Sequence, residues 1–279
     1  LLNVVTGLGS VVGAELVRSP DVAKISFTGS VGVGEGIMRD GAATMKRVTL
    51  ELGGKSPTVM LDDAALDQAV PSALTMAFLN SGQACAAGTR LLVPKSRLDA
   101  VKRAIQEAMR DFTVGDPADP KIAVGPMVSQ KQYERVQSYI RKGIEEGAEV
   151  LVGGEGHPEG LEAGYFVKPT VFVNVDNDMT IAREEIFGPV LSVIAYDSED
   201  DAIRIANDSD YGLHASVLGT DLRRARRVAS QIRAGRVVIN TMTDDPQAPW
   251  GGFKYSGVGR EYGRYGIEAF LETRAILES

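Results

Sequence analysis

Cys85 has the residue type and the setting of a catalytic nucleophile. It is the only cysteine in the 279-residue chain, and the small residues Gly82 and Ala84 precede it. Small neighbours let a reactant approach the sulfur closely, which favours a reactive thiol. The alternative is a small inert hydrophobe in the core. A Cys–His pair of the protease type is disfavoured, since the only histidines are His157 and His214.

Glu51 is the matching candidate for a general base. It lies among apolar residues at the end of a predicted strand. If its side chain is buried, its pKa rises towards the range in which a carboxylate accepts a proton from water. The alternative is an outward-facing strand position in solvent.

The segment Phe27-Thr28-Gly29-Ser30 indicates a strand that leads through a small turn into a helix start. Free backbone N–H groups at a helix start favour an anion such as a phosphate. Simple helix capping explains the same residues. Glu185 within residues 184–189 and the turn at residues 249–252 are two further candidate site segments, each weakly indicated by itself.

Short strands and helices alternate through the first 60 residues and predict a parallel sheet with crossover helices. Predicted strands there are 3–5, 24–27, 47–52 and 57–61, and predicted helices are 10–17 and 31–40. The pattern of the residues after about 60 predicts a second α/β unit. Its helices are predicted at 62–79, 96–112, 129–147 and 260–271, and its strands at 91–93, 171–173, 190–195, 216–218, 237–239 and 273–277.

Composition excludes several classes of function. The chain is 44% hydrophobic and 24% charged with a net charge of −7, which is typical of a globular protein and argues against nucleic acid as a partner. No apolar run is long enough for a membrane span, and the start lacks the features of a secretory signal. A single cysteine suits a reducing compartment, so we expect a cytoplasmic protein. No histidine or cysteine spacing indicates a metal site.

Taken in order, five motifs resemble those of the aldehyde dehydrogenase superfamily. The resemblance extends along the whole chain, and the spacing of Glu51 and Cys85 agrees with the family pattern. The motifs are Phe27-Thr28-Gly29-Ser30, Glu51-Leu52-Gly53-Gly54-Lys55-Ser56-Pro57, Gly82-Gln83-Ala84-Cys85, Glu185-Ile186-Phe187-Gly188-Pro189 and Pro249-Trp250-Gly251-Gly252-Phe253-Lys254-Tyr255-Ser256-Gly257.

The resemblance implies an α/β fold with part of a Rossmann-like parallel cofactor-binding sheet and a complete catalytic domain. Residues 1–53 would be the remaining cofactor domain and residues 54–255 the catalytic domain. Residues 256–272 would return to the cofactor domain, and residues 273–279 would form a strand that pairs with a neighbouring subunit of a homo-oligomer, a dimer or a tetramer.

The resemblance also implies the chemistry and the roles of single residues. Cys85 would add to an aldehyde to give a thiohemiacetal, hydride transfer to NAD or NADP would leave a thioester, and Glu51 would activate the water that releases the acid. The residues implied to bind the cofactor are Gly29, Ser30, Gly34, Leu52, Glu185 and Phe187. Those implied to line the aldehyde tunnel are Leu79, Trp250 and the loop 241–248.

The chain departs from the family pattern after Ser30, where a Thr-Glu pair is frequent and Val31 and Gly32 stand instead. Family members also carry a longer N-terminal portion, including an oxyanion-binding asparagine, that has no counterpart before the first glycine turn. We therefore expect a partial chain whose oxyanion donor is the Cys85 backbone N–H. The acidic residues Asp244 and Asp245 leave two interpretations, a preference for cationic aldehydes or a solvated loop.

Two other functions remain open from the sequence. A chain that lacks part of the cofactor domain could be a non-enzymatic or impaired fragment that acts by associating with another chain. Cys85 and Glu51 could also hydrolyse an activated ester without nicotinamide. The sequence decides neither the aldehyde nor the choice between NAD and NADP.

Overall fold

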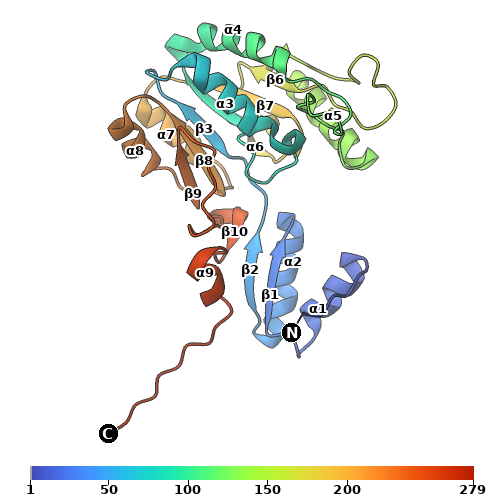
Figure 1. Cartoon of the computed structure of the whole chain (residues 1–279), viewed down its shortest axis with the longest axis vertical. Coiled ribbons are helices and arrows are strands. Elements are labelled where there is room, and N and C mark those ends of the chain that lie inside the picture. Colours follow the sequence, from blue (N-terminus) through green and yellow to red (C-terminus); the bar gives the residue numbers. More distant parts are fainter. Residues whose placement is uncertain (1) are drawn as a thin grey trace.

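The computed structural model describes residues 2–279 and contains two β-sheets of different size (Figure 1). The smaller sheet has the order β1-β2-β10, in which β1 (Lys24–Thr28) and β2 (Arg47–Glu51) run parallel. The short strand β10 (Gly257–Val258) comes from near the C-terminal end and pairs antiparallel with β2. The C-terminal part of the chain therefore returns to the strand that carries Glu51.

The larger sheet has seven strands, and all its neighbouring pairs except β5–β6 are parallel. In spatial order they are β5 (Glu149–Val152), β6 (Thr170–Val173), β7 (Val190–Tyr196), β4 (Arg90–Pro94), β3 (Pro57–Met60), β8 (His214–Leu218) and β9 (Arg236–Ile239). The chain passes from the smaller to the larger sheet between Glu51 and Pro57.

Helices cover both faces of the larger sheet because its central strands are apolar on both sides. Leu91 and Val93 of β4 pack into a core with α3 (Leu66–Phe78) and α4 (Leu98–Ala108). Leu92 between them points to the opposite core, as the alternation of a strand requires. The helices of that second core are α5 (Gln130–Glu145), α6 (Thr180–Arg183), α7 (Glu199–Asn207) and α8 (Leu222–Ala229).

The unit around the smaller sheet has a small core of its own. Its buried apolar side chains are Val17, Ile37, Leu50 and Leu52. They come from α1 (Ala14–Arg18), from α2 (Val31–Gly41), from β2 and from the residue after it. A π-helical turn (Gly9–Gly13) precedes α1, and α9 (Gly263–Glu268) lies beside the unit.

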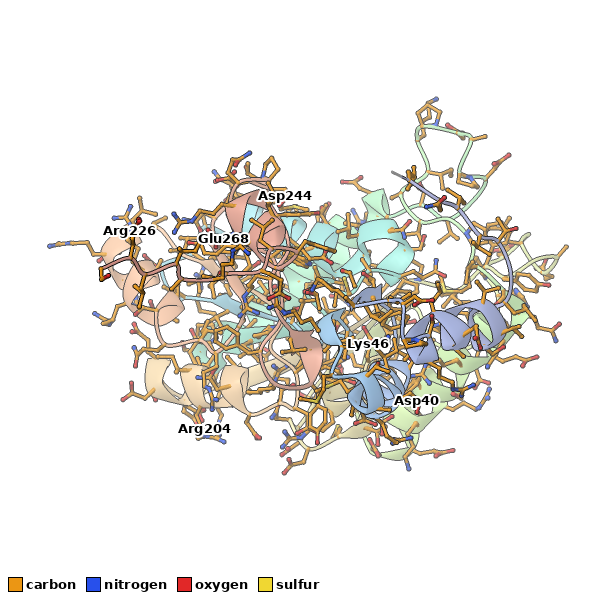
Figure 2. The ribbon with its side chains drawn as sticks, turned by 90° about the horizontal axis from the view of Figure 1, so that it is seen from below. Asp40, Lys46, Arg204, Arg226, Asp244 and Glu268 are labelled. Atoms are coloured by element: carbon orange, nitrogen blue, oxygen red, sulfur yellow. The ribbon has the colours of Figure 1, made fainter. Side chains whose placement is uncertain are left out.

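Surface charges tie parts of this smaller unit together. Viewed from below, Lys46 and Asp40 lie on the unit of α1 and α2, while Arg204 and Arg226 project outward from α7 and α8 (Figure 2). Lys46 donates to backbone carbonyls at the end of α1, and Asp40 pairs with Arg18 at 3.4 Å.

In the described part of the chain, no helix has the length and apolar character needed to cross a membrane.

The structure corrects several predicted elements. Residues 3–5 form no strand, because no neighbouring strand lies beside them within residues 2–279, and Val4 and Val5 are exposed. Residues 273–277, whose predicted strand would pair with a neighbouring subunit, extend away from the body of the single chain (Figure 1). Four further elements, β5, α6, α7 and β10, were not predicted from the sequence.

The predicted starts of helices were less accurate than the predicted positions of most strands. The helix predicted from residue 62 begins at Leu66, because Asp63 instead binds the backbone N–H and hydroxyl of Thr220. The helix predicted from residue 96 begins at Leu98. The helix predicted for 260–271 is the shorter α9. The helix predicted from residue 129 begins, in contrast, at Gln130, and Ser129 caps it, since its hydroxyl accepts from the Gln132 N–H at 3.3 Å.

Candidate active site

Glu51 is the last residue of β2 and is buried, with 3% of its surface exposed. Neither of its carboxylate oxygens has a hydrogen-bond partner among the described residues. Burial, with the charge of Glu261 second, raises the pKa of Glu51 to about 7. The side-chain N–H of Trp250, which lies near without completing a hydrogen bond, and the charge of Arg260 oppose the shift in this pKa. A carboxyl group with this pKa can both accept and release a proton near neutral pH.

A strained turn links α3 to Cys85. Asn80, Ser81 and Gly82 have consecutive positive φ angles of 49°, 58° and 70°. This left-handed backbone is unfavourable for residues with a side chain. Gly82 is required for a second reason, because a Cβ atom there would overlap the carbonyl of Gly188. The turn therefore brings the Cys85 segment against the loop that follows Glu185.

Side chains of the turn hold it in place. The Ser81 hydroxyl accepts from the Gly125 N–H at 2.9 Å, and the Gln83 Oε1 atom accepts from the Val128 N–H at 2.9 Å. These bonds to the segment before α5 offset the cost of the left-handed backbone. The sequence analysis assigned no role to Ser81 or Gln83.

Cys85 is half-buried, and its thiol lies within the fields of two carboxylates. Burial raises the pKa of the Cys85 thiol most, followed by the charges of Glu185 and Glu51. The backbone N–H groups of Cys85 and Ala86 lower it. The resting group is therefore a thiol, and a nearby base is needed to form the nucleophilic thiolate.

Gly53 and Gly54 bring Glu185 against the end of β2. The Gly54 N–H donates to Oε1 of Glu185 at 3.1 Å. A Cβ atom on Gly53 would overlap the Glu185 carboxylate, and one on Gly54 would overlap the Cys85 carbonyl. Burial raises the pKa of Glu185 against the opposing effects of the Gly54 N–H, Lys55 and Arg135. The glycine pair is thus the junction of three predicted site residues.

The start of α2 leaves its polar groups free of side-chain capping. Ser30 precedes the helix in an extended conformation, and its hydroxyl makes no capping bond. Gly34, one turn later, lies against Leu52, and a Cβ there would be 2.8 Å from that side chain. The Gly29 N–H donates to the Glu51 carbonyl at 3.0 Å. The predicted anion site at α2 is therefore bonded directly to the strand end that carries Glu51.

Phe187 lies on a constrained loop beyond Glu185. Its φ angle is 60°, and its side chain is part of the surface. The Gln132 amide donates to the carbonyls of Ile186 and Phe187 at 3.0 and 2.8 Å, and Arg135 donates to the Glu185 carbonyl at 2.7 Å. Helix α5 therefore sets the position of this loop.

A cleft of about 260 Å³ lies next to the Cys85 segment. Leu79 and Trp250, both predicted to line an aldehyde tunnel, line it together with Ala86. Part of the loop 241–248 completes the wall. The lining residues are Met76, Leu79, Ala86, His214, Arg236, Val238, Met242, Thr243, Asp244, Trp250 and Tyr262.

The family model described as "Aldehyde dehydrogenase family" matches residues 1–276. The chain belongs to the aldehyde dehydrogenase family. A curated relative from Staphylococcus haemolyticus and one from Staphylococcus saprophyticus, both named as aldehyde dehydrogenases, are each 51% identical over 276 residues. The match covers 99% of this chain and 58% of each relative, so the chain spans little more than half of their length.

Solved structures of aldehyde dehydrogenases have the same fold. A cysteine-to-alanine variant of AldC from Pseudomonas syringae, in complex with NAD+ and octanal, superposes with a TM-score of 0.95 at 49% identity, covering 98% of this chain and 56% of that one. An aldehyde dehydrogenase of Mycobacterium tuberculosis in complex with NAD+ gives a TM-score of 0.90 at 49% identity, covering 92% of this chain and 53% of that one.

In this aldehyde dehydrogenase chain, Ser256 fixes the end of β2 from the C-terminal side. Its hydroxyl is fully buried, donates to the Gly53 carbonyl at 2.7 Å and accepts from the Gly212 N–H at 3.0 Å. The sequence analysis quoted Ser256 within a motif but gave it no role. Burial of the hydroxyl, which the sequence does not reveal, is what identifies its function.

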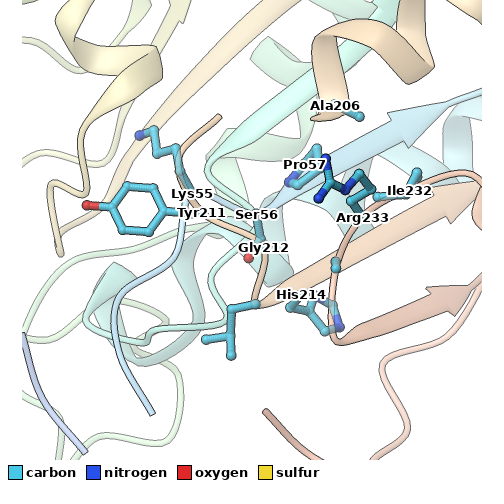
Figure 3. Close-up of a pocket in the computed structure, with 11 residues that line it drawn as sticks. Lys55, Ser56, Pro57, Ala206, Tyr211, Gly212, His214, Ile232 and Arg233 are labelled. Atoms are coloured by element: carbon cyan, nitrogen blue, oxygen red, sulfur yellow. The ribbon is translucent and has the colours of Figure 1, made fainter. Parts of the chain in front are cut away.

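Lys55 is a second residue whose setting the sequence did not reveal. Its side chain is almost fully buried, and Nζ has no hydrogen-bond partner within residues 2–279. Burial, with Arg90 second, lowers the pKa of Lys55 to about 7, while Glu185 and Glu184 oppose the shift. Lys55 and Tyr211 line a cavity of about 10 Å³, the size of a water molecule (Figure 3).

Proposed function

We propose that the protein oxidises an aldehyde to a carboxylic acid, with NAD+ or NADP+ as the hydride acceptor. Family membership and the aldehyde dehydrogenases that superpose on the chain support this activity. The observation that carries the proposal is a meeting of segments just after Glu51, where the Gly54 N–H donates to Glu185 at 3.1 Å and Gly54 lies against the Cys85 carbonyl. A cleft that could admit an aldehyde reaches the residue next to that thiol.

The residues present fit a dinucleotide cofactor. We propose that Gly29, Ser30 and Gly34 hold its pyrophosphate at the start of α2, where the Ser30 hydroxyl is not used for capping. Glu185 would bind the nicotinamide ribose, Phe187 would pack near that ribose, and Leu52 would lie beside the nicotinamide ring. Bound there, the nicotinamide would accept the hydride that leaves the thiohemiacetal carbon on Cys85.

In the other steps, Cys85 would be the nucleophile and Glu51 the general base. Glu51 accepts the thiol proton, and the Cys85 thiolate adds to the aldehyde carbonyl to give a thiohemiacetal. The Cys85 backbone N–H donates to the oxygen that becomes negative. Glu51 would pass the thiol proton on to solvent before the thioester is hydrolysed. The Glu51 carboxylate would then take a proton from water, the hydroxide would attack the thioester carbonyl, and the departing Cys85 thiolate would take that proton back, which leaves the acid and the thiol.

The test is aldehyde-dependent formation of NADH or NADPH, measured by absorbance with the chain and with its Cys85→Ala variant. We expect the activity to disappear in Cys85→Ala and to persist in Ser96→Ala, a matched change at an exposed position. Equal activity in Cys85→Ala would contradict the proposal. Ester cleavage that needs no nicotinamide, without aldehyde oxidation, would support the esterase alternative, and absence of both activities would support a fragment that acts through another chain.

We also propose a division of the chain by role. Residues 2–53 of the predicted cofactor unit 1–53 would hold the dinucleotide, while Leu1 lies outside the described residues. Residues 54–255 would carry out the chemistry, and residues 256–272 would return to the cofactor unit. The exposed residues 273–279 would pair with a neighbouring subunit in a dimer or tetramer in the cytoplasm. Support comes from the tail's extended, exposed course.

A further inference from the structure

The cleft beside Cys85 contains a charged side chain that the proposed reaction does not use. Arg236, the first residue of β9, lines the cleft, and only 15% of its side chain is exposed. Its guanidinium lies over the Trp250 ring, 4.6 Å from the ring centre. This cation–π contact fixes the guanidinium within the wall of the cleft.

The hydrogen bonds of Arg236 are incomplete. Its Nη1 atom pairs with Asp244, a residue of the loop 241–248 whose side chain is 59% exposed. Its Nη2 atom is buried and has no acceptor in the described part of the chain. An arginine guanidinium presents paired N–H groups that suit the two oxygens of a carboxylate. The Nη2 atom therefore lacks an acceptor, and the acceptor of Nη1 lies on a solvent-exposed loop.

The ion pair between Arg236 and Asp244 is easily exchanged. Asp244 is the exposed partner, so water can replace Arg236 as its hydrogen-bond partner at small cost. The remaining polar residues of the cleft supply no competing charge. Burial, with Arg236 second, lowers the pKa of His214 to about 4, so this imidazole is neutral at pH 7. With Asp244 turned out to solvent, the cleft wall would carry a single positive charge.

We propose that Arg236 binds a carboxylate at the far end of the aldehyde, which replaces Asp244, so that the preferred substrates are semialdehydes. The inference rests on the proposed function, because it assumes that the aldehyde enters this cleft. In this inference Asp244 does not bind a cationic aldehyde. Asp244 would compete with the substrate for Arg236, and its exposure makes it the weaker partner.

Binding can be measured without turnover in the Cys85→Ala background. Trp250 is the only tryptophan of the chain, so its fluorescence reports a ligand that arrives at Arg236. The probes are hexanal and adipic semialdehyde, which have equal chain length and differ in the terminal carboxylate. We expect adipic semialdehyde to bind about tenfold more tightly, the effect of one partly exposed charge-assisted hydrogen bond.

Two added substitutions should move this preference in opposite directions. Arg236→Met should abolish it, so that adipic semialdehyde and hexanal bind this variant equally. Asp244→Asn should strengthen adipic semialdehyde binding several-fold, because the competing carboxylate is gone. Arg226→Met removes an exposed arginine elsewhere and is the matched control, which should change neither affinity.

Equal affinities for the two probes, or a preference that survives Arg236→Met, would overturn the inference and leave the proposed function standing. Tighter binding of an amine-terminated aldehyde that Asp244→Asn weakens would also overturn it, in favour of a cationic substrate. Failure of both probes to bind would overturn the inference together with the assignment of the cleft. Loss of aldehyde oxidation in the chain, with the semialdehyde preference intact, would instead count against the proposed function alone.

Discussion

At the scale of single residues, the site depends on carboxylates that burial has made weakly acidic. Glu51 and Glu185 come from segments far apart in the sequence, and both act on the thiol of Cys85. Charge at one of these groups changes the proton affinity of the others. A base and a nucleophile can therefore exchange a proton near neutral pH.

The pH dependence of turnover should follow Glu51. Its pKa of about 7 means that the base form, and with it thioester hydrolysis, increases as pH rises through 7. Because the charge of Glu261 contributes to that raised pKa, Glu261→Gln should move the acidic limb of the kcat profile to lower pH. The measurement is kcat against pH for both forms, and an unchanged limb would contradict this assignment.

Lys55 should make stability depend on pH. Its pKa is lowered to about 7 in the folded chain from the usual 10.5, so between these values the unfolded chain binds more protons. The free energy of unfolding should therefore rise from pH 7 to pH 9, and Lys55→Met should flatten this rise. Urea unfolding of both forms at the two pH values checks it. The exposed Lys95→Met is the control and should keep the slope.

At the scale of elements, glycines determine how closely the end of β2 meets the other segments. Gly54→Ala should disrupt the site, because its Cβ would overlap the Cys85 carbonyl. Gly36→Ala within α2 meets no atom within 4 Å and should stabilise the chain by about 0.5–1 kcal/mol through helix propensity. Thermal unfolding and aldehyde oxidation of both variants test this pair. Full activity in Gly54→Ala would show that the close contact is dispensable.

Strands were better predicted from the sequence than helix ends. Buried apolar runs such as residues 91–93 belong to strands whatever their neighbours, so their location follows from local sequence. Asp63 illustrates the opposite case, since it is a good capping residue that binds Thr220 from a distant part of the chain instead. Residues 3–5 have strand-forming side chains, but a strand also needs a partner.

The sequence predicted the main site residues but not how they meet. Cys85 and Glu51 were candidates from residue type and setting, and the family resemblance added Glu185. In the structure, all three lie close to one glycine pair. Burial of Lys55 and of Ser256 depends on contacts with distant segments, which no local pattern encodes. The Arg236–Asp244 pair likewise exists only because the loop 241–248 folds back over β9.

At the scale of the whole molecule, the two units differ in the size of their cores. Four buried apolar side chains form the core of the smaller unit, whereas two large cores enclose the larger sheet. Hydrogen exchange should therefore be faster in β1 and α2 than in β4 and α3, because opening the smaller unit exposes less apolar surface. Mass-resolved exchange of the 279-residue chain measures this, and equal protection would indicate one cooperative unit.

The central claim is a covalent thioester on Cys85 that Glu51 helps to hydrolyse. The most direct measurement is the mass of the Cys85 peptide after Glu51→Gln is mixed with an aldehyde and NAD+ and quenched in acid. We predict that the peptide gains the mass of the acyl group and that the gain requires NAD+. The gain should be slower than with Glu51, because the thiol proton must then pass to water, and the adduct should decay about 10²–10⁴-fold faster when Glu51 is present. An unmodified Cys85 peptide during active turnover, or an adduct on another residue, would contradict the account.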